Sequence, residues 1–209
     1  MINKVTRLAD IFEYIEEYQG IIFDLDDTLY PESDYVRSGY REVAKVLNTV
    51  PQAQKRLWDY FTVGKSAIDC LLEDAGIYSD ELKQRCLEAY RFQTPAITLT
   101  QEVKEILEKI KSDKAYLGII TDGRPEGQRA KIKALGLETY TTDIIITDEL
   151  GGVRYRKPCP LAFERMRQKW KIPYSKMVYI GDNPRKDFTA PEKLGMGAVW
   201  FWNAGGLYH

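Results

Sequence analysis

Five short apolar runs, separated by helical patterns, constrain the fold of this chain more than any other feature. The runs are continuous rather than alternating, as expected for strands that are buried on both faces. Between them apolar residues recur at helical spacing, most clearly over residues 103–110. Strand–helix–strand repetition predicts a parallel α/β sheet with right-handed crossovers and helices on both faces. The predicted strands are 21–23, 116–120, 144–146, 177–180 and 198–201, and further helices are expected near 126–135, 160–170 and up to 194.

One segment, from about Ser33 to Gln93, contains no strand-like run. Its apolar residues recur at helical spacing, and the pattern is interrupted at Pro51, Gly64 and Gly76. This pattern predicts a bundle of about four helices inserted directly after the first strand. We therefore expect an α/β core of residues 1–30 and 95–209 and a helical cap domain of residues 31–94. The cap is expected above the carboxyl ends of the strands, where open α/β sheets bind ligands.

Composition sets modest bounds on the class of protein. The chain has 209 residues, a formal net charge of -1 and no basic run, so nothing favours a nucleic-acid partner. The three cysteines, Cys70, Cys86 and Cys159, are far apart, which predicts reduced thiols in the cytoplasm. No segment has the length of a membrane span or of a signal-peptide apolar region. The single histidine, His209, argues against a histidine-based catalytic triad.

A pair of carboxylates, Asp24 and Asp26, follows the first predicted strand in the stretch Asp-Leu-Asp-Asp-Thr-Leu. A bend after Phe23 can turn both acids toward one point, where their repulsion is costly unless a cation or a shared proton offsets it. A hard divalent metal held by oxygens, typically Mg²⁺, is the usual solution. The alternative is a polar turn in which Asp27 and Thr28 cap a helix.

Three further polar motifs follow predicted strands or precede helices. Thr121-Asp122-Gly123 offers a hydroxyl and backbone N–H groups beside a helix N-terminus, which suits an anion. Lys157, followed by Pro158, can lie across a phosphate as a compact charge. Gly181-Asp182 would bring a third carboxylate to the metal. Each motif taken alone is also compatible with an ordinary turn, helix cap or surface lysine.

Taken together, these motifs lie at the carboxyl ends of parallel strands and therefore on one rim of the sheet. They provide two acids, a hydroxyl, a lysine and a third carboxylate. These groups suffice for phosphoryl transfer by positioning and electrostatic stabilisation. A phosphorylated small molecule is therefore the expected partner.

The sequence resembles the haloacid dehalogenase-like (HAD) hydrolase superfamily over its whole length, including the helical cap behind the first motif. The resemblance implies a Rossmann-like core and places its four motifs at Asp24-x-Asp26-x-Thr28, Thr121, Lys157 and Gly181-Asp182-x4-Asp187. It implies that Asp24 is the nucleophile and Asp26 the acid/base. By the same resemblance Thr121, Asp122 and Lys157 contact the phosphoryl group. The resemblance also implies that Mg²⁺ is bound by Asp24, Asp182 and the backbone carbonyl of Asp26, and that Asp187 supports the metal site.

Within this superfamily, an acid at the position of Asp26 points to phosphate esters rather than carbon–halogen bonds. We therefore expect a cytoplasmic Mg²⁺-dependent phosphatase acting on a small soluble monoester, without a nucleic-acid or membrane partner. A phosphosugar mutase and a non-catalytic phospho-ligand binding protein are the alternatives. Candidate specificity residues are Tyr35, Arg37 and Tyr40 on the first cap helix and Arg124 beside Thr121, although packing or surface roles also suit them.

Overall fold

The computed structural model describes residues 2–113 and 115–207. These residues divide into two compact units. The first unit contains the described residues up to Glu32 together with those from Thr98 onward, and the second contains Ser33–Ile97. The two are described separately below.

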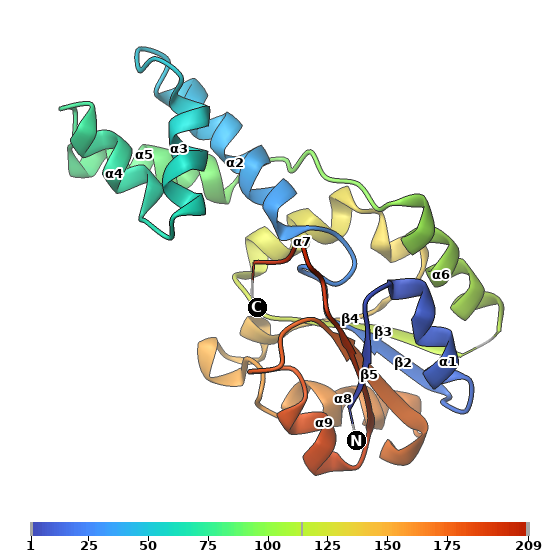
Figure 1. Ribbon diagram of the computed structural model, residues 1–209. Helices are drawn as coiled ribbons and strands as arrows, with labels where there is room; N and C mark the ends of the chain where they lie inside the picture. Colours follow the sequence, from blue (N-terminus) through green and yellow to red (C-terminus); the bar gives the residue numbers. More distant parts are fainter. Residues whose placement is uncertain (1, 114, 208–209) are drawn as a thin grey trace. The chain divides into compact units, whose positions relative to one another are not determined.

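A six-stranded sheet forms the centre of the first unit. The strands are ordered β1-β6-β5-β2-β3-β4, and every neighbouring pair is parallel (Figure 1). Strand β2 is therefore central, with β3 on one side and β5 on the other. The strands are β1 (Asn3–Val5), β2 (Gly20–Phe23), β3 (Tyr116–Thr121), β4 (Asp143–Ile146), β5 (Met177–Gly181) and β6 (Gly197–Phe201).

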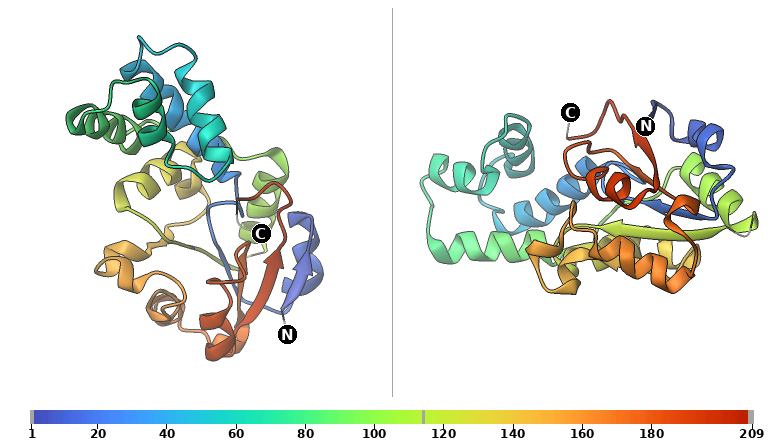
Figure 2. Two further views of the ribbon diagram at one scale, coloured as in Figure 1. Left: turned by 60° about the vertical axis from the view of Figure 1, so that its left-hand side comes forward. Right: turned by 90° about the horizontal axis from the view of Figure 1, so that it is seen from below.

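Helices cover both faces of this sheet (Figures 1 and 2). Helices α8 (Leu161–Trp170) and α9 (Thr189–Leu194) lie on one face, and α1 (Phe12–Ile15) and α6 (Gln101–Ser112) lie on the other. Helix α7 (Pro125–Ala134) connects β3 to β4. The parallel sheet with helices on both faces confirms the predicted Rossmann-like α/β core.

The packing of α8 against the sheet is close because glycines face it. A Cβ atom added to Gly20 of β2 would lie 2.6 Å from a ring carbon of Trp170. At Gly118 of β3 it would lie 2.9 Å from the side chains of both Met166 and Trp170. The two glycines therefore allow the indole of Trp170 to lie directly on the sheet surface.

The second unit consists, in its described residues, of four helices. They are α2 (Glu32–Val46), which begins in the first unit, α3 (Ala53–Thr62), α4 (Ala67–Asp74) and α5 (Asp80–Arg91). Apolar side chains from all four form one buried cluster, which includes Val43, Leu57, Leu71 and Cys86. The unit therefore has its own hydrophobic core.

The five strands expected from apolar runs are all present, and helices occur at 101–112, 125–134, 161–170 and 189–194. Strand β1 was not predicted. It is a three-residue edge strand in which only Val5 is buried, so Asn3 and Lys4 give no apolar run. Within the described residues, no helix is both long and apolar enough to cross a membrane.

Candidate active site

Asp24 follows the central strand β2 and is almost completely buried, with 1% of its surface exposed. Its Oδ1 atom lies 2.8 Å from Nζ of Lys157, and its Oδ2 atom lies 3.8 Å from Nζ of Lys186. Burial would raise the pKa of Asp24, but the two ammonium groups outweigh burial and lower it. In the described part of the chain, Oδ2 has no hydrogen-bond partner. The site therefore favours an ionised carboxylate, one oxygen of which accepts no hydrogen bond from the described residues.

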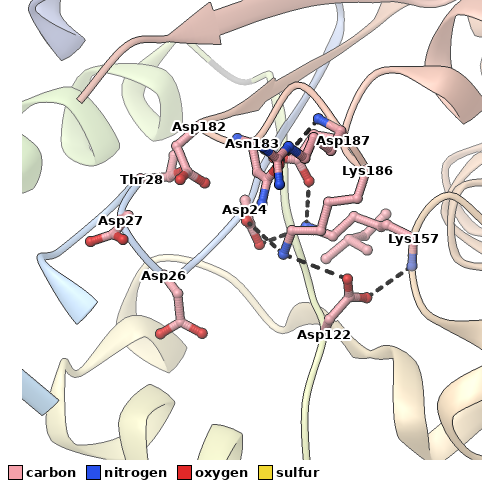
Figure 3. Close-up of polar contacts among 12 residues, drawn as sticks. Asp24, Asp26, Asp27, Thr28, Asp122, Lys157, Asp182, Asn183, Lys186 and Asp187 are labelled. Carbon is pink, nitrogen blue, oxygen red and sulfur yellow. Dashed lines mark hydrogen bonds and ion pairs between the residues drawn. The ribbon is translucent and has the colours of Figure 1, made fainter. Parts of the chain in front are cut away.

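Three buried carboxylates, those of Asp24, Asp182 and Asp187, form a cluster (Figure 3). Each contributes one oxygen, and these oxygens lie within 4.8 Å of one another. Burial and the charges of Asp24 and Asp187 raise the pKa of Asp182 to about 8. A hard cation with a preference for oxygen ligands would relieve this repulsion. The oxygens of this cluster therefore fit a divalent ion such as Mg²⁺.

Asp187 also has structural partners. Its Oδ1 atom lies 2.8 Å from Nζ of Lys157, and its Oδ2 atom accepts a hydrogen bond of 2.9 Å from the backbone N–H of Asn183. The side chain therefore links the lysine to the loop that carries Asp182. This arrangement suits the supporting role expected for Asp187.

The Asp26 carboxylate points away from this cluster and toward α7 (Figure 3). Its Oδ1 atom accepts a hydrogen bond of 2.5 Å from the Tyr30 hydroxyl and lies 2.7 Å from Nζ of Lys131. Its Oδ2 atom accepts a hydrogen bond of 2.9 Å from the amide of Gln128. The two carboxylates of the first motif are thus held by different parts of the fold.

Thr121 and Asp122 follow β3, next to the central strand. The Thr121 hydroxyl is buried, and no described residue forms a hydrogen bond with it, so it is free to bind a ligand oxygen. The Oδ1 atom of Asp122 accepts hydrogen bonds from the Thr147 hydroxyl at 2.8 Å and from the Lys157 backbone N–H at 3.0 Å. A phosphate contact by Asp122 would therefore come from its backbone, because its carboxylate anchors the Lys157 loop.

Lys157 lies between the acids of the first and fourth motifs. Its side chain is fully buried, and Nζ donates a hydrogen bond of 2.7 Å to the Tyr179 hydroxyl in addition to its ion pairs with Asp24 and Asp187. Burial would lower the pKa of Lys157, but Asp187 and Asp24 raise it. The raised pKa favours the charged form of the lysine, which neutralises part of the acidic cluster.

The family model for haloacid dehalogenase-like hydrolases matches residues 21–201, which span both units. The chain belongs to this family. Within the HAD-like family it is similar to the glyceraldehyde 3-phosphate phosphatase of Methanocaldococcus jannaschii, with 28% identity over 198 residues, covering 87% of this chain and 83% of that protein. It is also similar to the phosphoserine phosphatase of Thermus thermophilus, with 28% identity over 129 residues, covering 62% of this chain and 50% of that protein.

Solved HAD-like structures share the fold. YfnB from Bacillus subtilis, determined bound to magnesium, has a TM-score of 0.65 and 20% identity, covering 88% of this chain and 87% of that chain. A HAD phosphatase from Thermococcus onnurineus has a TM-score of 0.53 and 22% identity, covering 87% of this chain and 85% of that chain. At these identities the comparison shows a common fold.

Several residues at this HAD-like site were not predicted from the sequence. They are Lys186, Tyr179, Gln128 and Lys131. Gln128 and Lys131 are three residues apart on α7 and so share a helix face, a spacing that is visible in the sequence. Lys186 lies within the fourth motif, immediately before Asp187. No sequence pattern indicates that its ammonium group reaches Asp24.

The candidate specificity residues have ordinary packing or surface positions within their own units. Tyr35 and Tyr40 are buried, and both contact the ring of Tyr90, with centroids 5.9 and 5.7 Å apart. The Arg37 guanidinium lies over the ring of Trp58, 3.5 Å from its centroid. Arg124 is exposed at the N-terminus of α7. For the two tyrosines, packing within the helical unit accounts for their positions.

Proposed function

We propose that this hydrolase is a Mg²⁺-dependent phosphatase that hydrolyses a small soluble phosphate monoester through an aspartyl-phosphate. The observation that carries the proposal is the state of Asp24. Lys157 and Lys186 favour its charged form, and its Oδ2 atom has no hydrogen-bond partner among the described residues. A carboxylate in this state is a nucleophile with one oxygen available for attack.

The proposed reaction has two displacements at phosphorus. In the first, an oxygen of Asp24 forms a bond to phosphorus as the bond to the leaving alkoxide breaks, and protonated Asp26 gives its proton to that oxygen. In the second, the Asp26 carboxylate takes a proton from water, whose oxygen attacks phosphorus and releases Asp24 and inorganic phosphate. Asp26 therefore acts first as an acid and then as a base, and it ends each cycle protonated.

The proposed metal ligands are the carboxylates of Asp24 and Asp182 and the backbone carbonyl of Asp26. When bound, Mg²⁺ would neutralise the acidic cluster and the charge of the phosphoryl oxygens. Asp187 would keep Lys157 in place, and Thr121 would donate its unpartnered hydroxyl to a phosphoryl oxygen. All of these residues belong to the first unit, which we propose to be the catalytic core.

The names of the similar proteins support this proposal. The relatives from Methanocaldococcus jannaschii and Thermus thermophilus are named as phosphatases of small phosphorylated metabolites. The structure of YfnB from Bacillus subtilis is bound to magnesium. A small phosphorylated metabolite is accordingly the proposed substrate class.

The proposal is tested by phosphate release from a panel of sugar phosphates, nucleoside monophosphates and small phospho-acids, with and without Mg²⁺. We expect release that requires Mg²⁺ and is abolished in Asp24→Asn, and the best substrate identifies the class. Thermal unfolding and circular dichroism of Asp24→Asn control for loss of the fold. Equal turnover in a correctly folded Asp24→Asn protein would rule out the aspartyl-phosphate.

A further inference from the structure

We propose that the C-terminal segment Trp200–Leu207 positions the metal site by holding two of its loops. One loop carries Asp182, and the other is the turn at Asp27 that follows Asp26. Trp200 and Asn203 are thereby assigned as positioning residues, which act through the backbone of these loops and not on the metal or the substrate. The inference rests on the Mg²⁺ site of the proposed function and adds to it residues that lie outside the four motifs.

The first contact joins strand β6 to the loop of Asp182. The Nε1 atom of Trp200 donates a hydrogen bond of 2.9 Å to the backbone carbonyl of Asp182. Trp200 lies opposite Gly181 in the pairing of β6 with β5, so its indole is beside the point at which the chain leaves β5. The ammonium group of Lys4 lies over the same ring, 4.6 Å from its centroid. The indole therefore fixes the backbone from which the Asp182 carboxylate projects.

The backbone at Asp27 has an unusual conformation. Its φ angle is 54°, in the left-handed region that residues other than glycine rarely adopt. The planar peptide group between Asp26 and Asp27 contains the Asp26 carbonyl, so the conformation of Asp27 helps to set the direction of that carbonyl. A rarely adopted conformation persists only where the surrounding structure holds it. Contacts that hold Asp27 therefore also hold a proposed metal ligand.

The C-terminal segment supplies two of the hydrogen bonds that hold Asp27. Its buried side chain points away from Asp24 (Figure 3), and Oδ1 accepts a hydrogen bond of 2.8 Å from the Glu32 N–H. Oδ2 accepts one of 2.7 Å from the Leu207 N–H, and the Asp27 carbonyl accepts one of 2.8 Å from Nδ2 of Asn203. The Asn203 amide is itself oriented, because its Oδ1 atom accepts a hydrogen bond of 3.0 Å from the Gly205 N–H.

These contacts should matter for metal affinity because Mg²⁺ tolerates little distortion. It demands near-ideal octahedral geometry, so its ligands must be held in place before it binds. Hydrogen bonds behind metal ligands provide such orientation, and their removal commonly weakens metal binding. Loss of the Trp200 or the Asn203 contact should therefore weaken Mg²⁺ binding more than it changes the reaction of the loaded protein.

The test measures Mg²⁺ affinity by calorimetry, together with the Mg²⁺ concentration that gives half-maximal hydrolysis of an aryl phosphate. Trp200→Phe keeps an aromatic ring and removes the N–H donor, and Asn203→Leu removes the amide at similar volume. We expect each variant to bind Mg²⁺ about three- to tenfold more weakly, the fold-change for one lost hydrogen bond. The kcat at saturating Mg²⁺ should fall much less than the affinity. The double variant should show about the product of the two effects, because the contacts act on separate loops.

Lys4→Met is the matched control for Trp200→Phe. It removes the exposed cation from the Trp200 ring and leaves the indole N–H in place. Circular dichroism and thermal unfolding without metal check that each variant folds, and Asn203→Leu decides the question if Trp200→Phe does not. Mg²⁺ affinities equal to that of the wild-type protein in the folded variants would overturn the inference. An equal loss in Lys4→Met would overturn the role of Trp200, because the effect would then come from the sheet edge.

Calorimetry needs no turnover, so its result separates this inference from the proposed function. If the variants bind Mg²⁺ more weakly than a wild-type protein that hydrolyses no ester, only the phosphatase assignment fails. If hydrolysis requires Mg²⁺ but the variants bind it as tightly as the wild-type protein, only the role of the C-terminal segment fails. A wild-type protein that binds no Mg²⁺ would overturn both.

Discussion

The ammonium group of Lys131 lies 2.7 Å from Oδ1 of Asp26, and both side chains are largely buried, with 6% and 16% exposed. Gln128, one helical turn earlier on α7, donates a hydrogen bond to the other carboxylate oxygen. A short ion pair and a hydrogen bond to separate oxygens fix the direction of a carboxylate. The proposed acid/base is therefore oriented by α7, while the proposed nucleophile is held by Lys157.

Replacing Lys131 with Met should lower kcat for an alkyl phosphate about tenfold and change KM little, because a displaced acid/base loses part of its contribution to proton transfer. Steady-state kinetics of Lys131→Met beside Lys133→Met check this expectation. Lys133 is an exposed residue on the same helix, so its variant controls for charge and helix propensity. Indistinguishable kcat values for the two variants would show that Lys131 does not assist Asp26 in proton transfer.

The Asp26→Asn variant should lose most of its turnover on an alkyl phosphate and less on an aryl phosphate. The phenolate leaving group needs no proton, whereas an alkoxide does, so only the alkyl ester depends on the acid. The measurement is the ratio of the two kcat values in the variant and in the wild-type protein. An unchanged ratio would show that Asp26 does not protonate the leaving group.

Magnesium should raise the melting temperature more at about pH 9 than at about pH 6. The pKa of Asp182 is about 8 in the folded protein, owing to burial and the charges of Asp24 and Asp187, against about 3.9 when unfolded. Between the unfolded and the folded pKa, Asp182 keeps its proton in the folded state but loses it in the unfolded state. In the absence of metal, the stability of the fold therefore falls as the pH rises through this range. Above the folded pKa, the Asp182 carboxyl group is already ionised, so Mg²⁺ binds without displacing a proton and stabilises the protein more.

Thermal scans at both pH values, with and without Mg²⁺, test this dependence. Asp182→Asn should flatten the pH dependence without metal and remove most of the stabilisation by Mg²⁺. A wild-type protein that gains equally from Mg²⁺ at both pH values would contradict the raised pKa at the metal site.

Gly20→Ala should destabilise the fold by about 1–3 kcal/mol through overpacking. The added Cβ would lie 2.6 Å from the Trp170 ring and 2.8 Å from Ile172, and neither side chain can move without disturbing the core. Chemical denaturation provides the free energy of unfolding. Gly205→Ala, at an exposed loop position where only the Asn203 side chain lies within 4 Å, is the control and should have little effect.

The fold could be predicted from the sequence because its strands are buried on both faces and therefore read as unbroken apolar runs. The exception, β1, lies at a sheet edge and buries only Val5, so it carries no comparable signal. The compact helical unit spans Ser33–Ile97, and its four helices have stripes of apolar residues that form a separate core.

The positions of the site residues along the chain could be predicted, but the directions of their side chains could not. Strand ends place Asp24 and Asp182 on one rim, and they do lie in one cluster. The Asp26 carboxylate is directed by Gln128 and Lys131, which are more than a hundred residues away in sequence. Such contacts depend on how α7 packs, which no local pattern encodes.

The central position of β2 determines when the site can form during synthesis. Its neighbours in the sheet are β3 and β5, whose residues pair with Gly20–Phe23 from positions 116–119 and 177–180. A nascent chain thus carries Asp24 long before it carries Lys157, Asp182 or Asp187. Truncated products that stop before residue 187 would lack part of the charge balance around Asp24, so this cluster can assemble only after β5 has been synthesised and has paired with β2.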